Sequence, residues 1–515
     1  MRCLSKSTFK VPQIDRSQLL NYLAIFAIGF GVLVRLIQYF SNRSLWRDEA
    51  SLALNLVHRS YFQLLQPLDH NQAAPPGFLW IEKLALQLFG HSEYSLRLFP
   101  LIAGFVSLFA LYKLGRWGVS ELALPMAILL MACLKYPVRY SVQVKQYSSD
   151  VMVVLLLCLL LIPLRDRILK IGQTLLIGVL GAIAIWMAYP AIFALGGVEF
   201  ANLILAPYRK RISLILNRSL AYCIWIVSCV SLYFLTTANA MKNQALQSAW
   251  GPEYPESITD LGWIFVSFRQ FFDNPLGFHG IAEETAAIVF LIGCFAFLKS
   301  SVFRNNRYRL LILVSPILTT LVATYFHKYP FRTRLILFLT PFFILIIVQG
   351  ISFLLFKSNT FKYSWLVGVI VAFIILLPPT IDAIGLILRP EARTEVRPII
   401  EYIKIHKVPE DGIYVDSRGS PDQLKYYFEK YGFTTSDYIF GYGDFLNPTQ
   451  FSEQGWQDFQ QHSQLLGNKR RIWFIFSGLG PLDQSFVKPH LDRIGRELDY
   501  FKQPGAFTYF YQLNK

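Results

Sequence analysis

Residues 335–356 read LILFLTPFFILIIVQGISFLLF and contain no charged side chain. A helix rises about 1.5 Å per residue, so a stretch of this length crosses the ~30 Å hydrocarbon core of a bilayer. Apolar stretches recur from residue 19 to residue 388, which predicts a polytopic α-helical membrane protein with about eleven spans. We place these spans near 19–40, 94–112, 119–134, 149–163, 172–188, 190–206, 214–236, 283–298, 310–326, 335–356 and 363–388.

The overall composition agrees with a membrane protein. Of the 515 residues, 54% are hydrophobic and only 16% are charged, whereas soluble domains carry about 25% charged residues. An intrinsically disordered chain is therefore excluded. The six cysteines fall mostly in apolar runs without the spacing of zinc ligands, so we expect neither a disulfide framework nor a structural metal.

The basic residues predict the orientation in the membrane. Alternate loops hold 19 Lys/Arg against two acids, and loops of this kind lie in the cytoplasm. We therefore expect a plasma-membrane protein with a cytoplasmic N-terminus and residues 389–515 outside. These loops account for the net charge of +16, because the tail holds 16 Lys/Arg and 16 Asp/Glu. The charge is an orientation signal, and no nucleic-acid partner is expected. The cytoplasmic segments are 1–18, 113–118, 164–171, 207–218, 299–309 and 357–362.

The chain divides at residue 388 into a transmembrane domain, 1–388, and a soluble tail, 389–515. Within the tail, GIYVD (412–416), RIWFIF (471–476) and AFTYFYQL (506–513) have the composition of strands. PDQLKYYFEKYG (421–432) has that of a helix ending at Gly432. Alternating strands and helices predict a small extracytoplasmic α/β domain.

The first outer loop, 41–93, carries the first candidate site residues. Asp48 and Glu49 follow the first span, and the apolar residues after them recur at helical spacing, which predicts a helix along the outer membrane surface. Asp is also a favoured helix cap, so capping alone is the competing interpretation of Asp48. Farther on, His70 precedes Pro75-Pro76, and a solvated loop histidine is the alternative to a substrate contact there.

Basic residues also lie on the outer side, against the orientation rule. They occur in KYPVRYSVQVKQYSSD (135–150) and in HKYPFRTR (327–334). Snorkelling toward lipid headgroups is one explanation. A binding site for a lipid-linked phosphate is the interpretation we favour, since Arg offers a planar fork for phosphate oxygens and Lys a point charge.

These features fit one reaction. A sugar on a polyprenyl phosphate has a leaving group that needs charge stabilisation, which outer cations supply. An outward-facing carboxylate accepts the proton of the attacking hydroxyl as a general base. A transporter or flippase is the alternative, but we find no internal repeat and few mid-membrane charges. An anchored binding module is a third hypothesis, which leaves the 41–93 loop unexplained.

Several landmarks occur in the order seen in one family. They are WRDEA (46–50), HNQAAPPGFLW (70–80), RYSVQVKQYSSD (139–150), YPFRTRLILFLTPF (329–342) and an outer C-terminal domain. In this the chain resembles the C-type-fold (GT-C) membrane glycosyltransferases, in the glycosyltransferase family 39-like branch of protein O-mannosyltransferases, aminoarabinose transferases and bacterial Rgt-like enzymes. The resemblance covers most of residues 20–360.

The resemblance implies a role for each candidate residue. Asp48 is the implied catalytic base, with Glu49 as its neighbour or a substrate contact. His70 and Asp150 are implied substrate-binding residues, although Asp150 is also a candidate cap of the fourth span. The phosphate of the donor would be bound by Arg139, Lys145, Tyr147 and Arg334, the best match to the family's late-span arginine, with Arg332 as the close alternative.

The resemblance further implies a polyprenyl-phosphate sugar donor, an inverting transfer and a lipid, glycan or protein acceptor. In relatives the second outer loop often has a Glu where this chain has Gln143, and that departure weakens the case for a second carboxylate or metal ligand there. A divalent metal ion stays open from sequence, because Asp48, Glu49 and Asp150 either meet around one ion or never approach one another. The sugar and the acceptor class are likewise open.

Overall fold

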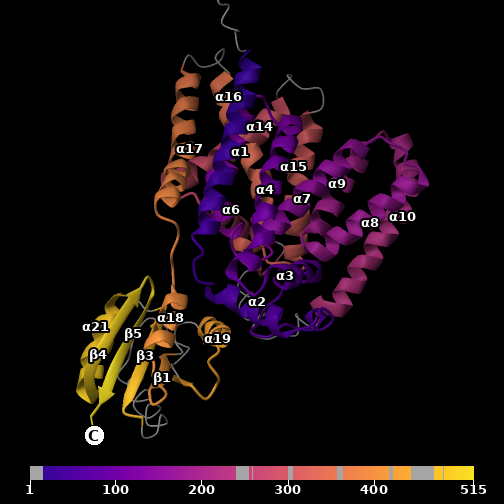
Figure 1. The fold of residues 1–515 in the computed structure, drawn as a ribbon. Helices are drawn as coiled ribbons and strands as arrows, with labels where there is room; N and C mark the ends of the chain where they lie inside the picture. The colour runs from indigo at the N-terminus through magenta and orange to yellow at the C-terminus, as the bar shows by residue number, and fades with distance from the viewer. Residues whose placement is uncertain are drawn as a thin grey trace, which may run out of the picture.

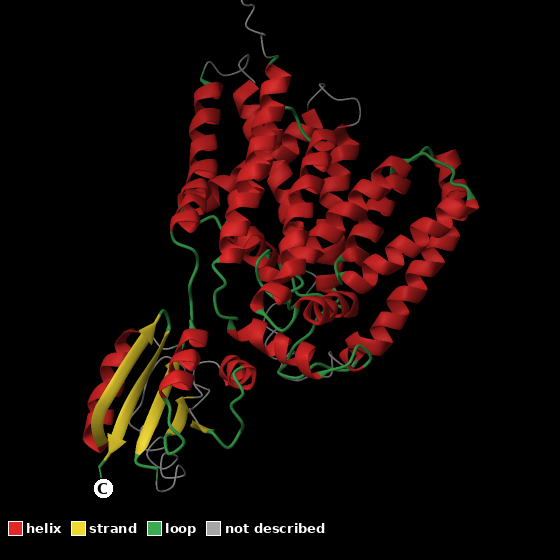
Figure 2. Ribbon diagram, viewed as in Figure 1, coloured by secondary structure: helices red, strands yellow, loops and turns green. Residues whose placement is uncertain are grey.

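The computed structural model describes residues 15–238, 254–257, 259–299, 306–356, 363–416, 421–441, 469–478 and 481–514. These residues form a helical bundle that continues into a sheet-containing tail (Figures 1 and 2). Parts of the predicted cytoplasmic segments, 1–14, 300–305 and 357–362, lie outside the described residues.

Each of the eleven predicted spans contains a helix. Among the described residues, eight helical segments are long and apolar enough to cross a membrane, namely Arg16–Phe40, Glu93–Gly118, Tyr147–Leu164, Tyr208–Thr236, Ile281–Lys299, Asn306–Tyr325, Thr333–Phe356 and Trp365–Leu388. The other three predicted spans hold shorter apolar helices, Ala123–Cys133, Ile171–Met187 and Ala191–Ile204. The chain is therefore a multi-pass membrane protein.

The helices of the bundle have the following bounds. They are α1 (Arg16–Phe40), α2 (Arg47–His58), η1 (Gln63–Leu65), α3 (Pro76–Phe89), α4 (Glu93–Gly118), α5 (Ala123–Cys133), α6 (Lys135–Tyr140), α7 (Tyr147–Leu161), η2 (Ile162–Leu164), α8 (Ile171–Met187), α9 (Ala191–Ile204), α10 (Tyr208–Leu232), η3 (Tyr233–Thr237), α13 (Leu261–Phe271), η5 (Phe272–Leu276), α14 (Ile281–Lys299), α15 (Asn306–Tyr325), η6 (Thr333–Leu339), α16 (Thr340–Phe356) and α17 (Ser364–Leu388).

The 335–356 segment lies at the centre of the bundle. It forms η6 and α16, and every residue of α16 from Thr340 to Ser352 is buried. Gly350 of α16 allows close packing on α14, because a Cβ there would collide with the carbonyl oxygen of Val289. Close backbone approach at small residues is the usual way that membrane helices associate. This segment therefore faces other helices more than lipid.

The helix predicted on the outer surface is present as α2, but its surroundings differ from the expectation. Figure 1 shows α2, α3 and α6 at the end of the bundle nearest the sheet. Residues from Glu49 to Leu56 are buried, and α2 contributes to a hydrophobic cluster that also contains Val396, Ile400 and Leu424 of the tail. The apolar face of α2 is thus covered by the tail, which replaces the lipid surface that the sequence suggested.

The tail is a five-stranded mixed sheet with helices on both faces. Its elements are α18 (Val396–His406), β1 (Gly412–Asp416), α19 (Pro421–Lys430), β2 (Tyr438–Gly441), β3 (Arg471–Ser477), α21 (Pro481–Ile494), β4 (Gly495–Gln503) and β5 (Ala506–Leu513). The strand order is β2-β1-β3-β5-β4, with β1 parallel to β2 and β3, and β5 antiparallel to β3 and β4.

The three predicted strands and the predicted helix of the tail are confirmed, with the helix ending at Lys430 and Gly432 adopting a left-handed φ of 81°. The edge strands β2 and β4 were not predicted. β2 has only four residues, and β4 is an exposed strand whose polar residues hide its alternation.

Candidate functional site

Asp48 lies in the first turn of α2, where its carboxylate accepts a hydrogen bond from Nη1 of Arg334 at the start of η6. Both side chains are partly exposed, at 27% for Asp48 and 32% for Arg334. Burial opposes ionisation of Asp48, but the charges of Arg334 and Lys145 outweigh it and lower the pKa of this carboxyl. Asp48 is therefore an ionised, accessible carboxylate between cations.

Capping does not explain Asp48. Helix α2 starts after Trp46, and the backbone N–H of Trp46 donates to Oε2 of Glu49 at 2.9 Å. Glu49 thus closes the start of the helix, as a glutamate at the third helical position commonly does. The carboxylate of Asp48 is left to face Arg334.

Glu49 is the neighbour of Asp48 in sequence but has a different environment. Its side chain is 1% exposed, and Arg97 of α4 binds both of its oxygens, at 3.0 and 3.1 Å. Oε1 also accepts from the backbone N–H of Val144 at 2.9 Å. Although burial opposes ionisation, Arg97 and Arg43 lower the pKa of Glu49. Through these hydrogen bonds, Glu49 connects α2 to α4 and to the second outer loop.

The second outer loop brings Lys145 and Tyr147 to the same place. Lys145 is buried, and its Nζ donates to Oε1 of Gln72. Burial lowers the pKa of Lys145 to about 8, while the charge of Asp48 acts against this shift. The guanidinium of Arg334 lies over the ring of Tyr147, 5.6 Å from its centroid. Lys145, Tyr147 and Arg334 therefore surround Asp48 from three elements.

His70 is held by the tail. His70 and Asn71 both adopt left-handed backbone, with φ of 59° and 53°. Nδ1 of His70 lies 2.8 Å from Oδ1 of Asp422 in α19. The other oxygen of Asp422 accepts from Ser51 of α2 at 2.6 Å. Asp422 consequently connects the His70 turn to the helix that carries Asp48.

The other three predicted residues have different surroundings. Arg139 of α6 pairs with Glu391, with Nε and Nη2 donating at 3.1 and 2.6 Å. Arg332 lines a cavity between η5 and the loop before η6. Asp150 is buried in the first turn of α7, with Oδ1 lacking a hydrogen-bond partner in the described part of the chain. Asp150 lies inside α7 and does not cap it.

Sequence reasoning missed Gln72, Arg97 and Asp422, which support the Asp48 cluster, and Glu391, which binds Arg139. Gln72 stands two positions after His70 in the HNQ motif, so its contact with Lys145 had a local signal. Arg97, Asp422 and Glu391 act across long sequence separations and had none.

The carboxylates do not form a metal-binding group. Among the described residues, no three His, Cys, Asp or Glu side chains are placed to hold one ion. Asp48 and Glu49 each bind a guanidinium instead. Because this donor set does not fit a divalent cation, no chemical step is assigned to a metal.

The comparisons with known proteins agree with this architecture. Residues 73–245, about a third of the chain, match the family model described as dolichyl-phosphate-mannose-protein mannosyltransferase. A similar solved structure is ArnT from Cupriavidus metallidurans bound to undecaprenyl phosphate, with a TM-score of 0.53 and 12% identity over 94% of this chain and 97% of that one. The chain has the GT-C fold.

A second similar structure is the oligosaccharyltransferase AglB from Archaeoglobus fulgidus in complex with an inhibitory peptide and a dolichol-phosphate. Its TM-score is 0.50, with 11% identity over 95% of this GT-C chain and 74% of AglB. A structure of the Archaeoglobus fulgidus oligosaccharyltransferase in complex with Zn and sulfate has a TM-score of 0.52, with 11% identity over 95% of this chain and 72% of that one. No curated protein sequence matches the chain.

The predicted resemblance and fold class are confirmed by these findings: a polytopic helical GT-C protein with a small sheet domain at its C-terminus. The family match also supports glycosyl transfer as the class of reaction.

Proposed function

We propose that this GT-C protein transfers a sugar from a polyprenyl-phosphate carrier to a hydroxyl or amine of a lipid, glycan or protein acceptor, at the outer face of the plasma membrane. The observation that carries the proposal is the contact between Asp48 and Arg334 beside Lys145. One carboxylate and two cations in a partly exposed site match the needs of a base and of a phosphate leaving group. The ligands named for ArnT and AglB, undecaprenyl phosphate and dolichol-phosphate, support the lipid-linked donor.

Phosphate binding would make Asp48 a stronger base. Without ligand, Arg334 and Lys145 keep the pKa of Asp48 low, and a carboxylate with a low pKa is a weak base. A phosphate that takes hydrogen bonds from Arg334 adds a negative charge beside Asp48 and weakens its ion pair. The pKa of Asp48 then rises, so the base becomes effective when the donor is bound.

The transfer step is an inverting displacement at the anomeric carbon. The acceptor oxygen or nitrogen attacks C1 on the face opposite the phosphate, and its proton passes to Asp48. The bond between C1 and the phosphate oxygen breaks, and the electron pair leaves on the polyprenyl phosphate. Arg334, Lys145 and the hydroxyl of Tyr147 stabilise that charge, so the leaving group needs no proton.

The remaining residues support this centre. We assign Glu49 as a positioning residue, because its carboxylate is fully engaged by Arg97, Trp46 and Val144. His70 positions Gln72, the partner of Lys145, through the turn that Asp422 holds. For Arg139 we propose a structural contact with Glu391 in place of phosphate binding.

We further propose that residues 1–388 form the transmembrane catalytic domain and residues 389–515 an outer domain that holds the first loop in place. The last apolar helix ends at Leu388, and all five strands follow it. The basic loops predict that the N-terminus is cytoplasmic, which places α2, α6 and the sheet outside.

The test is Asp48→Asn in membranes supplied with a polyprenyl-phosphate sugar. Transfer should fall at least 100-fold, the lower end of general base catalysis. Asp166→Asn, a matched change in a predicted cytoplasmic loop, should leave the rate unchanged. Undiminished transfer by Asp48→Asn would reject Asp48 as the base, and lipid translocation that survives the substitution without any sugar transfer would favour the flippase.

A further inference from the structure

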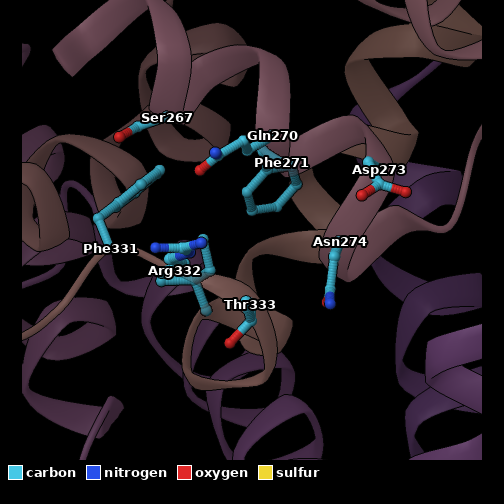
Figure 3. A pocket seen from close by; sticks show the side chains of 9 residues that line it. Ser267, Gln270, Phe271, Asp273, Asn274, Phe331, Arg332 and Thr333 are labelled. Atoms are coloured by element: carbon cyan, nitrogen blue, oxygen red, sulfur yellow. The ribbon is translucent and has the colours of Figure 1, made fainter. Parts of the chain in front are cut away.

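A cavity with a volume of about 180 Å³ lies between α13, η5 and the start of η6, and Thr333 in its lining immediately precedes Arg334 in the sequence. Figure 3 shows Ser267, Gln270 and Phe271 approaching it from one side and Arg332 and Thr333 from the other. Its lining residues are Ser267, Gln270, Phe271, Asp273, Asn274, Phe331, Arg332, Thr333 and Ile336.

The lining has the chemistry that recognises a ring bearing many hydroxyl groups. Gln270 and Asn274 supply amides that both donate and accept, and Ser267 and Thr333 supply hydroxyls. Phe271 and Phe331 form an aromatic wall, with ring centroids 6.2 Å apart. Aromatic walls with a few placed polar groups are typical of small-molecule sites. This combination suits a sugar, which has an apolar face and polar edges.

One lining atom is unsatisfied. Oδ1 of Asn274 is buried without a hydrogen-bond partner in the described residues, and η5 departs from helical backbone at this residue, with φ of −141° and ψ of 105°. Buried polar atoms are usually paired, so an orphan beside a cavity points to a missing ligand. A sugar hydroxyl is a suitable donor.

The backbone links this cavity to the proposed phosphate site. Thr333 stands between Arg332 and Arg334 and has a left-handed φ of 49°, which is rare for a β-branched residue. Arg332 lines the cavity, whereas Arg334 contacts Asp48. Strain of this kind persists only where the surrounding structure holds it, often at ligand sites. The two arginines are therefore close in sequence but contribute to different features, Arg332 to the cavity and Arg334 to the contact with Asp48.

We propose that this cavity binds the sugar ring of the lipid-linked donor, and that the sugar is neutral and rich in hydroxyls. The inference rests on the proposed function, since the phosphate at Arg334 would direct the attached sugar into the cavity. One cation, Arg332, and one anion, Asp273, are present, and Asp273 also pairs with His279 at 2.9 Å. The volume is enough for one sugar ring.

The experiment compares Gln270→Leu with Gln66→Leu, a matched change at an exposed residue of the first outer loop. Gln270 is itself exposed, so folding should be unaffected. We expect Gln270→Leu to raise KM for the lipid-linked sugar about tenfold, the effect of losing one or two hydrogen bonds. Inhibition of Gln270→Leu by sugar-free polyprenyl phosphate should not change. Arg332→Gln should likewise raise KM for the lipid-linked sugar and leave this inhibition unchanged. Gln66→Leu should resemble wild type.

Two outcomes would overturn the inference. An unchanged KM for the donor in both variants would reject the cavity as a sugar site. A rise confined to KM for the acceptor would assign the cavity to the acceptor. In either case, loss of transfer in Asp48→Asn would show that the proposed function itself still holds, whereas absence of any transfer by the wild type would reject both.

Discussion

Two clusters of cations lie on the predicted outer side of this protein, and the second outer loop contributes to both. In one, Lys145 and Arg334 surround Asp48. In the other, Arg43, Arg139 and Arg393 bind Glu391, at 3.3, 2.6 and 2.9 Å. The carboxylates of Glu391 and Asp48 differ in their exposure and in the hydrogen bonds that they accept. Glu391 is 17% exposed and receives guanidinium groups on both oxygens, whereas Asp48 is 27% exposed and accepts a side-chain hydrogen bond from Arg334.

On the proposed function, this difference separates a structural contact at Glu391 from a reactive one at Asp48. A carboxylate offers about four lone-pair sites. Glu391 accepts four hydrogen bonds, from Arg43, Arg139 and Arg393, and so has no site available for a substrate proton. Glu391 joins the start of the tail to α6 and to the end of α1, and Glu49 joins α2 to α4 in the same manner. Charge excess alone does not locate the phosphate, because both clusters have more cations than anions. We propose the phosphate site at Arg334 and Lys145, because Asp48 beside them is the less engaged carboxylate.

Glu49→Gln should give the largest loss of stability. Removing one partner of a buried ion pair leaves Arg97 charged and uncompensated, which costs about 3–5 kcal/mol. Thermal unfolding in detergent should show a large fall in Tm, while Asp48→Asn should change Tm little. Equal falls for both variants would contradict the distinction between the two neighbouring carboxylates.

Arg334→Gln tests the cation that is assigned to phosphate. A charge-assisted hydrogen bond contributes about 1.5–3 kcal/mol, so affinity for polyprenyl phosphate should fall about 10- to 100-fold. Arg139→Gln should lower Tm, because Glu391 loses a partner, and should leave that affinity close to wild type. A larger loss of affinity in Arg139→Gln than in Arg334→Gln would reverse the assignment of the two clusters.

The pH dependence of donor binding should report Lys145. Its pKa is lowered to about 8 by burial, so the side chain is charged below that pH and neutral above it. Only the charged form attracts phosphate, and affinity for polyprenyl phosphate should therefore decline up to tenfold as the pH rises from 7 to 9. Lys145→Met should bind more weakly at pH 7 and lose this dependence. A pH dependence that persists in Lys145→Met would show that another group is titrating.

Asp422→Asn should have the smallest effect. Asp422 connects Ser51 of α2 to His70, and a neutral amide retains part of both hydrogen bonds. We expect a few-fold lower kcat with an unchanged Tm. Asp437→Asn, at an exposed turn of the tail, is the matched control. Loss of stability without any change in kcat would make Asp422 a purely structural link.

The sequence predicted the parts of the fold that depend on local pattern. Apolar runs located a helix in every span, and the basic loops predicted an orientation. Strands β1, β3 and β5 were recognisable because their residues are largely apolar. The burial of α2 under the tail was not predictable, since its cluster joins Leu52 and Leu56 to Ile400 and Leu424 across most of the chain.

Part of the candidate site was also predictable, because some of its residues stand out in the local sequence pattern. Asp48, Lys145, Tyr147 and Arg334 lie together, and each had a local signal, either a position after a span or a cation on the outer side. Sequence position could not distinguish Arg139 from Lys145, because the distinction depends on Glu391. The resemblance favoured Arg334 over Arg332, and in the structure the left-handed Thr333 separates the two residues.

The most direct test of the central claim is the binding of polyprenyl phosphate to Asp48→Asn, measured alongside sugar transfer by the same preparation. If Asp48 is the base and Arg334 holds the phosphate, the substitution releases Arg334 from its ion pair. Binding should then be as tight as in wild type or tighter, while transfer falls at least 100-fold. Loss of binding, or transfer at the wild-type rate, would contradict this division of roles.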